Sequence, residues 1–138
     1  MEEKKAGLPI ISDDLKWHFF SLYRLALSDE EFDFTEKELL YKIGIEHGIS
    51  PEQINEVVLT SNINPAIPGT TEEKIEYLYD LVRMAWADGK VVSEERDMIE
   101  KCVIRYGFLP ENASGIVDYF IESVKKNKSK TDILNEIN

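Results

Sequence analysis

Four carboxylates stand at matched positions in the two halves of this chain. Asp29 and Asp88 each follow an apolar stretch typical of a helix, and Glu36 and Glu95 come seven residues later. An aspartate at a helix C-terminus faces the partial negative charge of exposed carbonyls, which costs about 0.3–1 kcal/mol. If the flanking helices fold back on one another, each aspartate approaches its glutamate. Because oxygen-only clusters suit Ca²⁺, Mg²⁺ or Mn²⁺, the sequence predicts a divalent metal site formed by all four residues.

Each of these carboxylates also has an ordinary interpretation. An aspartate before a glycine is common in turns, and the helix dipole favours a glutamate in the first turn without any ligand. An EF-hand is excluded by spacing: a loop starting at Asp29 would place Phe34 where glycine is required and Leu40 where the bidentate glutamate belongs. The repetition of the pair, rather than either residue alone, therefore carries the metal hypothesis.

The repetition extends well beyond the carboxylates. When residues 22–52 are laid on residues 81–111 without a gap, ten of the 31 pairs are identical. These pairs include Leu22/Leu81, Arg24/Arg83, Gly48/Gly107 and Pro51/Pro110. An internal duplication of two helical units that bury their apolar faces against each other is the simplest account. It would place the acidic residues around a pseudo-twofold axis.

Helical periodicity and capping signals predict an all-α bundle of about seven helices in one domain over residues 1–138. The first repeat covers about residues 15–59, a proline-containing connector covers 60–69, the second repeat covers about 70–124 and a helical tail covers 125–138. Capping boxes are expected where a serine or threonine precedes a glutamate or glutamine by three residues. They fall at Thr35/Glu38, Ser50/Gln53 and Thr70/Glu73.

Composition limits the classes of function. The 138 residues carry a formal net charge of −11, and an acidic field of this kind repels nucleic acid. A cation or a basic protein partner remains compatible. The single cysteine, Cys102, allows neither an intramolecular disulfide nor a thiolate metal cluster, and no signal peptide or membrane span is recognisable. We therefore expect a cytoplasmic protein.

No catalytic set is apparent. His18 and His47 stand far apart in sequence and in no metal or triad spacing, so both are interpreted as ordinary helical residues. Cys102 lies at helical spacing with Met98 and Ile99, which indicates a core position. Motifs such as HExxH, CxxC and GxSxG are absent. The expectation is a protein that is not an enzyme.

The joint of the second repeat resembles a known family. The run from Ala85 to Val91, AWADGKV, followed by Glu95 and Ile99 and then by Tyr106-Gly107, is similar to the signature of the TerB-like tellurite-resistance family. It also resembles the related domain found beside a J-domain in a membrane-bound co-chaperone. The resemblance covers roughly residues 15–124.

The resemblance implies an all-helical cytoplasmic domain with an acidic, metal-binding face. Matched residue by residue, that role would fall on Asp88 and Glu95, and on Asp29 and Glu36 in the first copy. The first copy departs from the pattern, with Glu30 where the second has Gly89. The leading hypothesis is therefore a non-catalytic, TerB-like stress-response protein. The alternative is an interaction module whose acidic face recruits a basic partner without metal.

Overall fold

The computed structural model describes residues 11–27, 34–59, 65–87 and 89–137, and these residues form seven α-helices and no strand. The predicted all-α class is thereby confirmed. The helices are α1 (Asp13–Leu27), α2 (Phe34–Glu46), α3 (Pro51–Leu59), α4 (Thr71–Ala85), α5 (Ser93–Arg105), α6 (Pro110–Lys125) and α7 (Lys130–Ile137).

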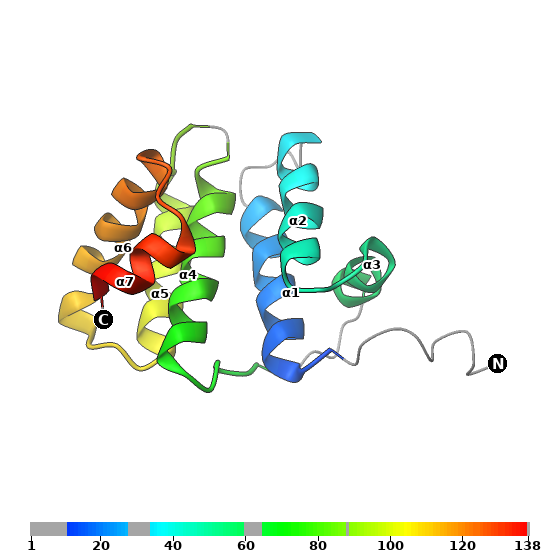
Figure 1. The fold of residues 1–138 in the computed structure, drawn as a ribbon, viewed down its shortest axis with the longest axis horizontal. Coiled ribbons are helices and arrows are strands. Elements are labelled where there is room, and N and C mark those ends of the chain that lie inside the picture. Colours follow the sequence, from blue (N-terminus) through cyan, green and yellow to red (C-terminus); the bar gives the residue numbers. More distant parts are fainter. Residues whose placement is uncertain (1–10, 28–33, 60–64, 88, 138) are drawn as a thin grey trace.

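Helices α1 and α4 pack against each other in the middle of the molecule (Figure 1). Helices α2 and α3 contact α1 on one side, and α5 and α6 contact α4 on the other. The short C-terminal helix α7 lies across α4. The facing sides of α1 and α4 are therefore covered from several directions.

One hydrophobic core receives side chains from all seven helices. Leu22 and Leu81, at the centres of α1 and α4, are almost completely buried, and Ile54, Ile99 and Ile133 extend the core into α3, α5 and α7. Burying one such side chain stabilises the fold by about 1.5–3 kcal/mol. Apolar burial thus fixes the positions of α1 and α4, on which the polar groups described below depend.

Of the three predicted capping boxes, the one at Ser50/Gln53 forms completely, whereas at Thr70 only the cap bond from the Glu73 amide forms, because the Glu73 carboxylate meets the Thr70 hydroxyl instead of its backbone amide. The Glu73 amide donates to Thr70 Oγ1 at 3.1 Å, and Gln53 and Ser50 exchange backbone-to-side-chain bonds of 3.2 and 3.0 Å. The box predicted at Thr35 is wrong, because a cap there would start the helix at Glu36, whereas α2 begins two residues earlier, at Phe34, and Thr35 lies inside the first turn. This start makes Glu36 the third residue of α2, just as Glu95 is the third residue of α5.

The turn from α2 into α3 is set by two glycines. Gly48 has a φ of +77°, a conformation that glycine adopts without steric cost. Gly44 allows α3 to approach closely, since a Cβ atom at this position would lie 2.3 Å from Ile54 Cδ1. The last turn of α2 is thus held in place both by its own backbone and by α3.

None of the described helices combines the length and the apolar character that a membrane crossing requires. Helix α5 begins 59 positions after the beginning of α2 and ends 59 positions after its end. This is the same offset that separates the ten identical residue pairs of the two halves.

Candidate metal centre

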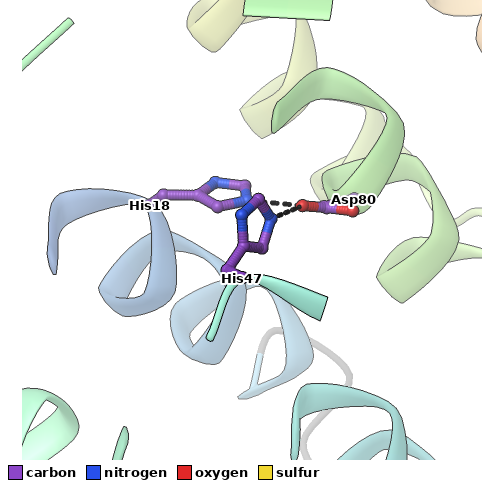
Figure 2. Close-up of side chains that lie close together, drawn as sticks. All are labelled: His18, His47 and Asp80. Carbon is purple, nitrogen blue, oxygen red and sulfur yellow. Dashed lines mark hydrogen bonds and ion pairs between the residues drawn. The ribbon is translucent and has the colours of Figure 1, made fainter. Parts of the chain in front are cut away.

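Two histidines converge on one carboxylate between α1, α2 and α4. Figure 2 shows both imidazole rings directed at the same oxygen of Asp80. His18 Nε2 lies 3.0 Å from Asp80 Oδ2, and His47 Nε2 lies 2.8 Å from the same atom. The side chains of His18 and Asp80 are inaccessible to solvent, whereas 14% of the His47 side chain is exposed. The cluster therefore has a buried interior and one side that solvent can reach.

The backbone places each of these side chains for a different local reason. His18 and Asp80 lie near the middle of α1 and α4, whose packing the core fixes. His47 directly follows α2 and is held by a Schellman motif, in which the Ile49 amide donates to Gly44 O at 2.8 Å and the Gly48 amide to Ile45 O at 3.0 Å. The motif turns the chain sharply, so the His47 ring projects toward α4.

The second oxygen of Asp80 faces two cations. Lys130 Nζ, from α7, lies 3.1 Å from Asp80 Oδ1, and Arg83 Nη1 lies 3.6 Å from it. The Lys130 contact is ionic rather than a well-directed hydrogen bond. Arg83 also forms a two-pronged pair with Glu46, at 2.9 and 3.3 Å. The negative charges of Asp80 and Glu46 are thus balanced by the positive charges of Lys130 and Arg83. Four helices, α1, α2, α4 and α7, meet at Asp80.

The His18 ring is fully buried and stacks against one aromatic ring. The Tyr77 ring stacks on it with a centroid separation of 4.1 Å and an interplanar angle of 7°. The other ring nitrogen of His18, Nδ1, is buried without a hydrogen-bond partner. Since Nε2 lies within hydrogen-bonding distance of a carboxylate, it carries the proton and donates it to Asp80, and a neutral His18 leaves Nδ1 as an unpaired acceptor.

Burial determines how these groups titrate. Desolvation lowers the pKa of His18 below its usual 6.5 despite the opposing hydrogen bond to Asp80. Burial alone would raise the pKa of Asp80, but the hydrogen bonds from His18 and His47 and the nearby Lys130 charge outweigh it and hold that pKa well below its usual range. Asp80 is therefore a carboxylate and His18 a neutral imidazole at neutral pH.

Acid is expected to weaken the fold through His18. Its pKa is lower in the folded state, so the unfolded chain binds more protons once the pH falls below 6.5. The free energy of unfolding should therefore fall as the pH is lowered from 7 to 5, with a His18 contribution approaching about 1.4 kcal/mol per pH unit. Urea unfolding followed by circular dichroism at several pH values measures this slope.

The matched variant for this prediction is His18→Phe, which keeps a ring against Tyr77 but has no titrating group. Its slope between pH 6.5 and 5 should be smaller than that of the natural chain. The Asp80 contribution has the same sign, but it is lost only as the pH falls below the usual carboxyl range. An equal slope in both proteins would contradict the assignment of acid sensitivity to His18.

The cluster could hold a metal ion. The two imidazole nitrogens and one carboxylate oxygen all lie within 4.8 Å of one another. Tetrahedral zinc with bonds near 2.0–2.1 Å requires ligand atoms roughly 3.3 Å apart, so the 2.8 and 3.0 Å separations would have to open by only a few tenths of an ångström. Two imidazoles and one carboxylate form a donor set common at zinc and other transition-metal sites.

The predicted acidic quartet has only two members among the described residues. Glu36 and Glu95 are buried, with 3% and 1% of their surface exposed. Glu95 Oε1 accepts a hydrogen bond from the Val92 amide at 3.0 Å, which caps the start of α5. Asp29 and Asp88 lie outside the described residues, so the four-carboxylate site stays a prediction.

Sequence reasoning overlooked the cluster that the fold assembles. It interpreted His18 and His47 as ordinary helical residues and gave Asp80 no role. The hydrogen bonds to Asp80 span 62 and 33 residues, far beyond any local motif. One signal was available: Asp80 is a charged residue on the apolar stripe of a helix whose neighbours Leu78 and Leu81 are buried. A charge in that position needs a partner.

Comparisons with protein families, with characterised proteins and with solved structures gave no match to this chain.

Proposed function

We propose that this protein is a non-catalytic helical domain that binds one divalent transition-metal ion through His18, His47 and Asp80. The observation that carries the proposal is the convergence of three ligand atoms where α1, α4 and the end of α2 meet. The ion would enter from the side of His47, whose side chain is 14% exposed, and water would supply the fourth ligand.

The donor types favour zinc, nickel or copper over calcium and magnesium. Imidazole nitrogen suits the former ions, whereas Ca²⁺ and Mg²⁺ prefer oxygen ligands. For an ion to bind, both imidazoles must present an unprotonated Nε2, so each neutral ring carries its proton on Nδ1. The affinity should therefore fall as the pH is lowered, because protons compete for the same nitrogens.

Two features oppose the binding of a divalent ion and lower its expected affinity. Lys130 and Arg83 already balance the charges of Asp80 and Glu46, so a divalent ion adds uncompensated positive charge. A proton on His18 Nδ1 would find no acceptor there. Metal-binding histidines that lack such outer support lose about 10–100-fold in affinity. We therefore expect weaker binding than at a fully supported zinc site.

Metal titration of the chelator-treated protein tests the proposal. Calorimetry should show one equivalent of Zn²⁺ bound, and zinc at about 100 times its dissociation constant should raise the free energy of unfolding by about 2.7 kcal/mol. His47→Gln removes the most exposed ligand and should weaken binding at least tenfold. Mg²⁺ and Ca²⁺ should leave the melting temperature unchanged.

The double variant Glu36→Gln/Glu95→Gln is the matched control, because it alters the other candidate site. Zinc binding should persist in it. The proposal fails if zinc does not stabilise the protein, or if His47→Gln binds zinc as tightly as the natural chain. If Mg²⁺, Ca²⁺ or Mn²⁺ stabilises the protein and the double variant abolishes this effect, the acidic quartet is the site instead.

We further propose that the two halves arose by internal duplication. Supporting this, α2 and α5 have the same bounds after a shift of 59 residues. His18 and Tyr77, which stand 59 positions apart, stack on each other where α1 meets α4.

The TerB-like resemblance supports a role in stress response, which a comparison of metal or tellurite tolerance in cells with and without the protein would test.

The alternative function is recruitment of a basic partner without metal. The net charge of −11 favours it, since an acidic protein attracts a basic surface at long range. Binding of that kind should weaken progressively as salt is added. It should also survive chelator treatment, which distinguishes it from the metal hypothesis.

A further inference from the structure

A cleft of about 160 Å³ lies between α1, α4 and α5, and none of its lining residues belongs to the His18, His47 and Asp80 cluster. Apolar side chains form much of its wall, including Trp17, Leu25, Leu81 and Ile99. An apolar cavity of about 150 Å³ in a protein holds one benzene molecule. The cleft therefore has room for a ligand of about one ring.

The rim of this cleft is basic. Arg24, Lys101 and Arg105 all line it, and none of its lining residues is acidic. The chain has 27 acidic and only 16 basic residues, so most cations should find an acidic neighbour. Among the described residues, however, these three side chains make no ion pair. Three unpaired cations gathered around one cleft are unusual in so acidic a protein.

Aromatic rings hold both guanidinium groups in place. Arg105 Cζ lies 5.7 Å from the centroid of Trp17, and Arg24 Cζ lies 5.8 Å from that of Phe20. The two rings contact each other at 5.6 Å. Such cation–π contacts leave the edges of a guanidinium free to donate hydrogen bonds. The planar donor pattern of arginine matches the two oxygens of a carboxylate.

We propose that this cleft binds a small organic acid, with its carboxylate on Arg24 and Arg105 and its apolar body, about one ring in size, against Trp17. The positive charge of the rim favours a ligand with a carboxylate. The volume of the cleft and its apolar wall favour an apolar group of about one ring. Lys101 adds attraction without geometric demand, because an ammonium group acts as a point charge. This site is independent of the cluster formed by His18, His47 and Asp80 and of the function proposed for that cluster.

Benzoate is the probe for this proposal. Calorimetry should show saturable binding of one equivalent, and benzyl alcohol, which has the same body without the charge, should bind at least tenfold more weakly. Cys102 lies in the wall of the cleft and is the only cysteine in the chain. Saturating benzoate should therefore slow alkylation of the protein by iodoacetamide several-fold, as followed by intact mass.

The decisive variant is Arg24→Gln/Arg105→Gln, which should lower benzoate affinity at least tenfold. Lys37→Gln/Lys42→Gln removes the same charge from exposed positions on α2 and should leave the affinity unchanged. Circular dichroism verifies folding, and the single variants replace the double variant if it unfolds. The proposal is overturned if benzoate does not saturate, if the arginine variant binds it equally well, or if inorganic phosphate binds as tightly.

Discussion

Replacing Asp80 with asparagine should lower the free energy of unfolding by about 3–5 kcal/mol, the usual cost of removing one partner from a buried ion pair. Asp80 is fully buried and accepts from His18 and His47 through one oxygen while it faces Lys130 and Arg83 with the other. An asparagine can present an oxygen to only one of these two pairs. Its NH₂ group must then face donors or cations on the opposite side, whichever way the amide is turned.

Asp118→Asn is the matched control for this substitution. Asp118 pairs with Arg96 at 2.9 Å, but 64% of its side chain is exposed, so its loss should cost only about 0–1 kcal/mol. Chemical unfolding monitored by circular dichroism compares the two variants at constant pH. Equal costs would mean that the four helices do not depend on Asp80.

Replacing Ile133 with alanine should cost about 2–5 kcal/mol and release α7 from the bundle. Ile133 is completely buried and is the buried residue by which this helix of eight residues is anchored. A helix of that length is not stable alone in water. Leu134 packs against the core only partly buried, and the polar attachments include Lys130, which contacts Asp80, and Tyr79, which donates to Lys128 O at 2.8 Å in the loop before the helix.

Hydrogen exchange and urea unfolding together test this prediction. The amides of residues 130–137 should lose protection in Ile133→Ala before those of α1 and α4 do. Ile137→Ala is the control, since Ile137 lies in the same helix with 47% of its surface exposed and should change stability by no more than about 0.5 kcal/mol. If both variants behave alike, α7 is not held by its apolar anchor.

The two predictions concern the same group of charged residues around Asp80. Asp80→Asn removes the acceptor from the centre, and Ile133→Ala removes the helix that supplies Lys130 to it. Because Lys130 and Arg83 neutralise Asp80 and Glu46, the charges around Asp80 balance without an ion. An incoming metal must work against that balance, which is why its affinity is the informative measurement.

Local sequence determined most of the secondary structure. Short-range signals lie within one or two turns of the residues they affect, so the serine and threonine caps at Ser50 and Thr70 and the glycine at position 48 could be interpreted directly. The helix start predicted from a cap at Thr35 was two residues too late, a typical error at helix ends. The all-α class followed from the same local patterns.

Only the tertiary structure decided which side chains meet. The residues that gather at Asp80 come from α1, from the end of α2 and from α7, and no periodic pattern connects partners 62 or 33 positions apart. The same is true of the basic cleft, to which Arg24 and Arg105 come from α1 and α5. Helix formation depends on neighbours within four residues, whereas these sites depend on how apolar faces pack, and that packing is a property of the whole chain.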